Sequence, residues 1–151
     1  MSKIFDITSG ADMPFEERRL WVYLAVAVVV PAAYLVFILG EAQGTAVAEI
    51  AYQPPLLTAA VASVVTTIVL NAVVAALGHK DAHLRDQRDR EIDQRGDRVG
   101  FVVMSALTAV PLSLTLLEHP HFWIANTIYL AYVLSAVVSS IVKLVAYRKG
   151  F

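Results

Sequence analysis

The sequence contains no cysteine, and its four long apolar runs contain almost no charge. Without cysteine, disulfides, thiolate metal sites and thiol catalysis are all excluded. The runs cover residues 20–39, 56–77, 99–117 and 122–147, and Lys143 is the only charged side chain within them. A soluble helix of similar length would carry polar residues along its outer face. These runs are apolar on all sides, which indicates an integral membrane protein and not a soluble bundle.

Lysine and arginine are missing from two of the three segments that connect the runs. Residues 40–55 and 118–121 hold none, whereas all twelve lie before the first run, between the second and third, or toward the end of the fourth. Cytoplasmic segments of membrane proteins carry the excess of Lys and Arg. The distribution therefore predicts that both termini and the middle segment face the cytoplasm.

The lengths of the runs predict an all-α fold, because each is close to the ~20 residues that cross a bilayer's hydrocarbon core. We expect one transmembrane domain over the whole chain, an N-in/C-in four-helix bundle of two helical hairpins. Its helices are expected at about 18–40, 55–84, 90–117 and 121–148. The polar N-terminal residues do not form a cleavable signal, so the first helix should be retained. The expected location is a bacterial plasma membrane.

Pro31 and Pro111 lie inside the first and third predicted helices. Proline lacks a backbone N–H, and its ring clashes with the carbonyl four residues earlier. Each therefore predicts a kink, and kinked helices would leave space for a cavity between them.

A charged segment, residues 79–98, separates the second and third runs, and we call it the elbow. Three acid-then-base pairs stand four residues apart along it, an orientation that stabilises a helix by about 0.2–0.5 kcal/mol per pair. They are Asp81–Arg85, Asp86–Arg90 and Glu91–Arg95. We therefore expect the second and third helices to extend beyond the membrane into the cytoplasm.

Residues 86–100, which begin inside the elbow, read DQRDREIDQRGDRVG. This stretch resembles the signature of a group of small bacterial four-helix membrane proteins, which carry a (D/E)-x-R-D-x-E-I-D-x-R motif between their second and third helices. The resemblance implies a similar topology and no established reaction. Some members sit beside small helix-turn-helix regulators, so the resemblance also implies a regulatory partner.

Three interpretations of the elbow stay open. It is a self-paired hairpin that supports the bundle, a docking surface for a cytoplasmic protein, or a site for anionic lipid headgroups, which attract clustered Lys and Arg. The interleaved acids weaken the lipid interpretation. They also argue against direct nucleic-acid binding, because no uncompensated basic stripe is visible. The predicted partner-binding residues are Arg85, Arg88, Asp89, Arg90, Glu91, Asp93 and Arg95.

Two histidine pairs are candidate metal ligands. His79 and His83 stand four residues apart, a spacing that can chelate a metal, and His119 and His121 lie beside Glu118. Neither pair has an assured third ligand, and interfacial or turn histidines explain both. No phosphate-binding, dinucleotide or nucleophile motif is present. We therefore expect no metal, no cofactor and no enzymatic activity.

Polar side chains recur every four residues along the second and fourth runs. They are Ser63, Thr67, Asn71, Ser135, Ser139 and Lys143. Such faces allow close helix packing and hydrogen bonding between helices, within the chain or in a homodimer. The alternative is a polar path between the two helices, although no Asp, Glu or His lies near the midplane, where ion-coupled carriers place one. Asn71 needs a partner on a neighbouring helix, because an unpaired amide is costly in lipid.

The function predicted from these features is non-enzymatic. The leading hypothesis is a partner-binding or regulatory membrane module that uses the elbow, with the lipid bilayer and a cytoplasmic protein as its partners. The alternative is a small oligomeric transporter or channel with the polar path between its second and fourth helices.

Overall fold

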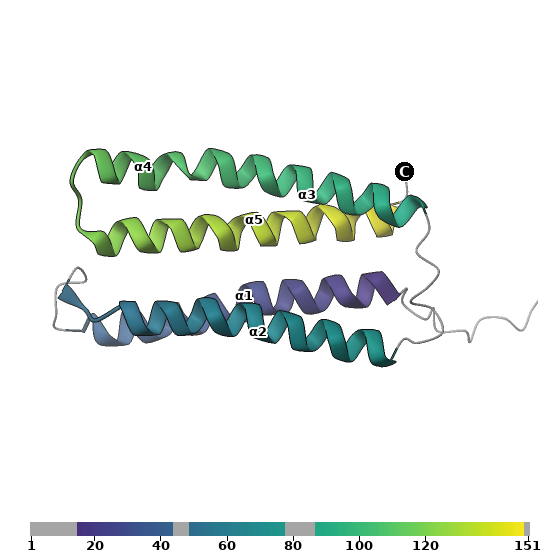
Figure 1. Cartoon of the computed structure of the whole chain (residues 1–151), viewed down its shortest axis with the longest axis horizontal. Coiled ribbons are helices and arrows are strands. Elements are labelled where there is room, and N and C mark those ends of the chain that lie inside the picture. Colours follow the sequence, from purple (N-terminus) through teal and green to yellow (C-terminus); the bar gives the residue numbers. More distant parts are fainter. Residues whose placement is uncertain (1–14, 44–48, 78–86, 150–151) are drawn as a thin grey trace, which may run out of the picture.

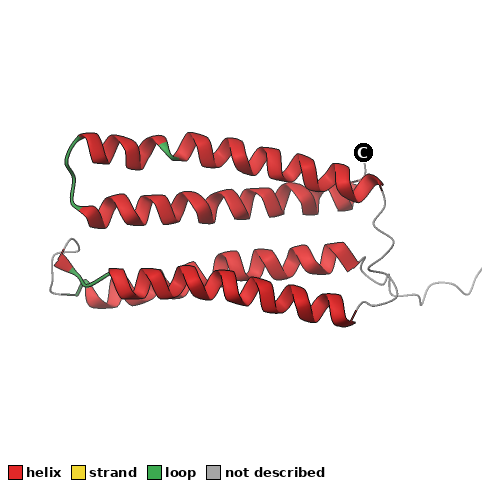
Figure 2. Cartoon of the chain, viewed as in Figure 1, coloured by secondary structure: helices red, strands yellow, loops and turns green. Residues whose placement is uncertain are grey.

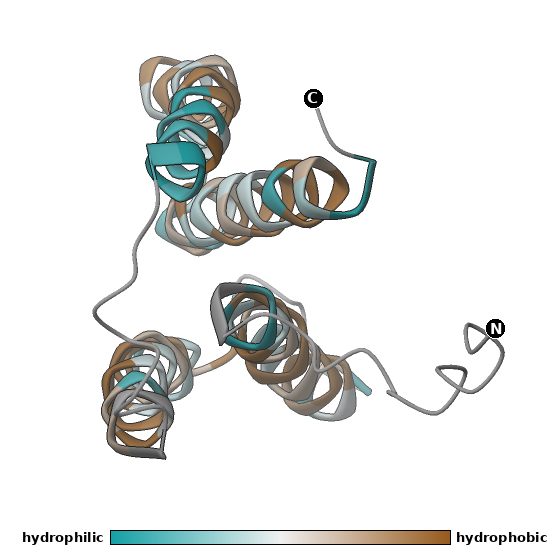
Figure 3. Ribbon diagram, turned by 90° about the vertical axis from the view of Figure 1, so that its right-hand side faces the viewer, coloured by the Kyte–Doolittle hydropathy of each residue, from teal (hydrophilic) through white to brown (hydrophobic). Residues whose placement is uncertain are grey.

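The computed structural model of the chain describes residues 15–43, 49–77 and 87–149, which are helical apart from short connections (Figure 2). Four helical spans are long and apolar enough to cross a membrane. Viewed end-on, their ribbons are coloured as hydrophobic over most of their length, with hydrophilic turns at the near end (Figure 3). The predicted all-α four-helix fold is therefore confirmed, and the spans indicate an integral membrane protein.

The helices form two hairpins that lie side by side (Figure 1). The first consists of α1 (Phe15–Glu41) and α2 (Gln53–Leu77). The second consists of α3 (Gln87–Leu107), α4 (Ala109–Leu116) and α5 (His121–Lys149). Both hairpin connections lie at the same end of the bundle. We call the opposite end, where α1 and α3 begin and α5 finishes, the charged end, because most charged residues gather there.

The third predicted helix, over residues 90–117, is present as one membrane-spanning helix, Gln87–Leu116. Its hydrogen-bond pattern is interrupted once, at Thr108, which keeps helical backbone angles and separates α3 from α4. Pro111 has no N–H to donate to the carbonyl of Leu107, and its ring crowds that carbonyl, so the interruption falls just before the proline. α1 in contrast continues through Pro31. α2 is described as far as Leu77, so the rest of its predicted extension to residue 84 lies outside the described residues.

α5 is the central helix of the bundle, since it packs against α1, α3 and α4, whereas α2 packs mainly against α1. At the charged end, Arg148 of α5 reaches two residues of α1. Its Nε lies 3.2 Å from Glu17 Oε1, and its guanidinium carbon lies 5.5 Å from the centre of the Trp21 ring. These contacts join the two hairpins at one end.

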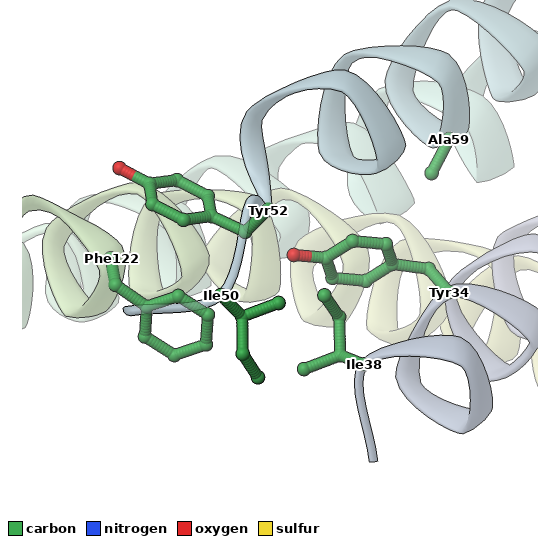
Figure 4. Packing of buried hydrophobic residues seen from close by; sticks show 6 residues of the cluster. All are labelled: Tyr34, Ile38, Ile50, Tyr52, Ala59 and Phe122. Carbon is green, nitrogen blue, oxygen red and sulfur yellow. The ribbon is translucent and has the colours of Figure 1, made fainter. Parts of the chain in front are cut away.

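An aromatic cluster joins the hairpins toward the other end (Figure 4). Its buried members are Tyr34, Ile38, Ile50, Tyr52, Ala59 and Phe122. The Tyr52 and Phe122 rings meet edge to face with centroids 5.0 Å apart, an arrangement worth about 0.5–1.5 kcal/mol beyond the burial of area. The Tyr34 hydroxyl donates to Asn126 Oδ1 at 2.7 Å, which links α1 to α5. The cluster therefore closes the space between the hairpins at this end.

Candidate functional site

The α3–α5 interface is built on residues with little or no side chain. Gly96 and Gly100 of α3 are buried, and Ile92, one turn earlier, is 1% exposed. The Ser135 hydroxyl of α5 donates to the Gly100 carbonyl at 2.8 Å, and a Cβ added to Gly100 would lie 3.0 Å from Ser139 Cβ. Small residues at this spacing let two helix backbones approach closely. The sequence interpretation missed this interface, although two glycines four residues apart were a usable signal.

Lys143 of α5 is held by two carboxylates of α3. Its Nζ lies 3.2 Å from Asp93 Oδ1 and 2.7 Å from Asp97 Oδ1, and its side chain is 13% exposed. The aliphatic stem of Lys143 passes over Gly96, where any side chain would collide with it. Because the ammonium is largely buried, its pairing is less screened by salt than that of a surface pair. Removing Lys143 would leave Asp93, whose side chain is only 24% exposed, as a poorly solvated charge.

The charges of α3 are sorted onto two sides of the helix. Asp89, Asp93 and Asp97 stand at i, i+4 and i+8 on the side of α5, where Asp89 accepts a hydrogen bond from the Tyr147 hydroxyl at 2.8 Å. Another side carries exposed residues at i, i+3, i+7 and i+10, which we call the basic stripe. Its members are Arg88, Glu91, Arg95 and Arg98. In the sequence the same acids and bases alternate, so this separation is invisible there.

The residues predicted to bind a partner occupy different environments. Arg85 lies outside the described residues, and Asp89 and Asp93 contact α5. The remaining four are exposed on α3 and are Arg88, Arg90, Glu91 and Arg95. Successive helical residues are about 100° apart, so Arg90 lies about 160° around the helix from Arg88 and does not belong to the basic stripe. Partner binding by these residues stays a prediction.

Asn71 has the partner on a neighbouring helix that the sequence required. Its Oδ1 accepts a hydrogen bond from Arg19 Nε at 2.9 Å. Its Nδ2 donates to the Tyr23 hydroxyl and to the Thr67 carbonyl of its own helix, the latter at 2.8 Å. The Arg19 guanidinium also lies 5.7 Å from the centre of the Tyr23 ring. This network connects α2 to α1 near the charged end.

A cavity of about 820 Å³ lies between the two hairpins, lined by α1, α2, α5 and the start of α3. Four of the six predicted polar residues line it, namely Ser63, Thr67, Ser139 and Lys143. The other two make the contacts already described, Asn71 with Arg19 and Ser135 with Gly100. Ser135 of α5 therefore contacts another helix of the same chain. Dimerisation through the predicted small-residue faces stays a prediction.

The cavity is charged at one end and mostly apolar elsewhere. Its charged lining residues are Arg19, Asp93, Asp97 and Lys143. Further along, the Ser63 and Ser140 hydroxyls donate to carbonyls of their own helices at 2.9 and 2.8 Å. The Tyr129 hydroxyl is buried close to Ser63 and makes no hydrogen bond of normal geometry with the described residues. The two serine hydroxyls of this part are therefore already bonded within the chain, whereas the Tyr129 hydroxyl could still bond to a ligand.

The cavity also opens sideways, between α2 and α5. Val64 and Ile68 of α2 line it and are 59% and 62% exposed, and Tyr132 of α5 is 62% exposed. Exposed apolar lining of this kind would face lipid in a membrane. In a membrane, this side of the cavity would therefore be open to lipid.

Comparison with known proteins adds no identification. The chain matches no protein-family model, no curated protein and no solved structure. The resemblance of residues 86–100 to small four-helix membrane proteins therefore stays a prediction. Within the described ranges, no three His, Asp or Glu residues gather in a way that could hold a metal ion. His79 and His83 lie outside those ranges, and His119 and His121 are exposed.

Proposed function

We propose that this integral membrane protein is a non-enzymatic module that binds a cytoplasmic protein through the basic stripe of α3, with both termini in the cytoplasm of a bacterium. The observation that carries the proposal is the sorting of charge on α3. Asp93 and Asp97 are paired with Lys143, and Asp89 is bonded to Tyr147. The exposed stripe contains three arginines and one glutamate, so its formal charge is positive.

An acidic protein surface fits this stripe better than a bilayer does. The stripe begins at Arg88 and extends over about three turns of helix before the apolar run starts at Val99. Complementary charges of this kind set the orientation and association rate of a partner. Glu91 stands in the middle of the stripe and would repel a uniformly anionic lipid surface, whereas a protein can place a basic residue opposite it. A regulatory protein of acidic surface is therefore the proposed partner.

The test compares charge reversal at two exposed arginines of the same helix. Arg88→Glu changes a residue of the basic stripe, and Arg90→Glu changes a residue outside it. Both substitutions change the net charge by the same amount. With the wild-type chain, we expect a partner protein to co-purify quantitatively from native membranes. Its amount should fall about tenfold with Arg88→Glu, a loss of about 1.4 kcal/mol of binding free energy, and should be unchanged with Arg90→Glu.

Equal retention by both variants would overturn the proposal. So would a result in which Arg88→Glu changes only the lipids that co-purify, because the stripe would then bind headgroups. Stability of both variants in detergent micelles confirms that a loss reflects binding, since both substitutions are at exposed positions.

A small transporter or channel is the second candidate, favoured by the cavity and by the four predicted polar residues that line it. The aromatic cluster closes the space between the hairpins at the end away from the charged residues, so transport requires these rings to separate. In proteoliposomes, this candidate predicts ion or solute flux that Ser63→Leu blocks. Flux no greater than that of empty liposomes would rule out the transporter or channel function.

A further inference from the structure

We propose that the cavity between the hairpins binds one phospholipid whose headgroup carries a primary amine, as in phosphatidylethanolamine. The phosphate would lie beside Arg19 and Lys143, the amine beside Asp93 and Asp97, and one acyl chain along the apolar lining. This site is separate from the basic stripe, so it goes beyond the proposed function and is tested independently of it.

The charges of the cavity select a headgroup of zero net charge. Two cations and two carboxylates line its charged end, and their formal charges cancel. An anionic lipid would add a negative charge without a new counter-ion, and a cationic amphiphile would add a positive one. A zwitterionic headgroup supplies one group for each sign, so the site stays neutral when it is occupied.

The donors and acceptors at the charged end suit phosphate and ammonium. Arg19 carries a planar guanidinium fork, a geometry that matches phosphate oxygens. A carboxylate can accept about four hydrogen bonds, and Asp97, whose side chain is 69% exposed, is approached by Lys143 at one oxygen and can accept another hydrogen bond. An ammonium group donates to carboxylates, whereas a trimethylated amine has no N–H to donate. The site therefore favours a primary amine.

The shape of the cavity suits an amphiphile that enters from the bilayer. Its charged lining residues stand at one end, and its side between α2 and α5 is bordered by the exposed apolar residues Val64, Ile68 and Tyr132. The aromatic cluster blocks the far end. A volume of about 820 Å³ lies within the usual range of about 300–1,000 Å³ for sites that hold a single small ligand.

The experiment measures which lipid stays bound after the protein is released from nanodiscs of equal phosphatidylethanolamine and phosphatidylglycerol content. Native mass spectrometry should show one retained phosphatidylethanolamine on the wild-type chain. Asp97→Asn leaves Lys143 paired with Asp93 and gives the lining one excess positive charge. We expect it to shift the bound ratio about fivefold toward phosphatidylglycerol, the effect of about one unit charge near a membrane surface.

Asp89→Asn is the matched control, since it removes the same charge from the same helix at a residue that contacts Tyr147 and does not line the cavity. Its bound lipid should be unchanged. Ala136→Phe, at an exposed position of the lining, should abolish retention by filling the cavity. The proposal is overturned if the wild-type chain retains both lipids equally, if the two aspartate variants behave alike, or if Ala136→Phe retains the lipid.

Discussion

Gly100 marks a close approach between α3 and α5, and the missing side chain is what that approach requires. An added Cβ would lie 3.0 Å from Ser139 Cβ and 3.4 Å from the Ser135 carbonyl oxygen. Gly100→Ala should therefore destabilise the bundle by about 1–3 kcal/mol, although alanine is the better helix former, because overpacking outweighs propensity. The midpoint of unfolding by SDS in mixed micelles measures this loss.

The same substitution at Gly40 should act in the opposite direction. Gly40 lies near the end of α1, and an added Cβ there meets nothing within 4 Å. Gly40→Ala should therefore raise stability by up to about 0.5–1 kcal/mol through helix propensity alone. If both variants shift the midpoint the same way, the close approach at Gly100 is not what limits packing.

For individual polar side chains, the sequence predicts some interaction partners and misses others. Asn71 was expected to need a neighbouring helix, because a lone amide is costly in lipid, and Arg19 and Tyr23 meet that need. The pairing of Lys143 with Asp93 and Asp97 was not foreseen. It depends on which side of α3 faces α5, and alternating charges along a chain do not contain that information.

The connection between α4 and α5 is tight enough to require an unusual backbone conformation. Glu118 has φ 54°, in the left-handed region. The His119 N–H donates to the Leu114 carbonyl and the Glu118 N–H to the Thr115 carbonyl, at 3.0 and 3.1 Å. This is the Schellman pattern that commonly ends a helix, with glutamate at the position that glycine usually occupies.

Glu118→Gly should therefore stabilise the second hairpin. The left-handed conformation costs roughly 1–2 kcal/mol for a residue with a side chain. Glycine removes this cost, but part of the resulting gain in stability is lost because glycine adds conformational freedom to the unfolded chain. We expect a net gain of about 0.5–1 kcal/mol in the SDS titration. Glu118→Ala is the control, since it removes the carboxylate and keeps the Cβ. A gain with alanine equal to that with glycine would assign the effect to charge.

Among the elements, the sequence predicted the helices well and their packing less completely. Run lengths gave four spans, and the short segment 118–121 required α4 and α5 to be antiparallel neighbours. The sequence did not predict which helices pack together, because all four runs are apolar on every side. The central position of α5 and the packing of α2 mainly on α1 are therefore seen only in the structure. The cavity follows from this arrangement, so only its polar lining residues were visible in the sequence.

For the whole molecule, the distribution of Lys and Arg predicts the orientation in the membrane. The absence of cysteine allows a direct measurement with single introduced cysteines. Gln43 follows the end of α1 and Gln94 lies in the half of α3 toward the charged end, and both are exposed. In intact bacterial cells, a membrane-impermeant maleimide should label Gln43→Cys and should label Gln94→Cys only after permeabilisation. The reverse pattern would place the basic stripe outside the cell and end the proposal of a cytoplasmic partner.

The spacing of the aspartates on α3 has a consequence for the register of the two helices. Asp89, Asp93 and Asp97 repeat once per turn, so a slip of α3 along α5 by one turn, about 5.4 Å, would still offer Lys143 two acids in one direction. Such a slip would bring Ile92 beneath the Lys143 stem in place of Gly96. The charges alone would therefore allow more than one alignment of the two helices, and the glycines select one of them.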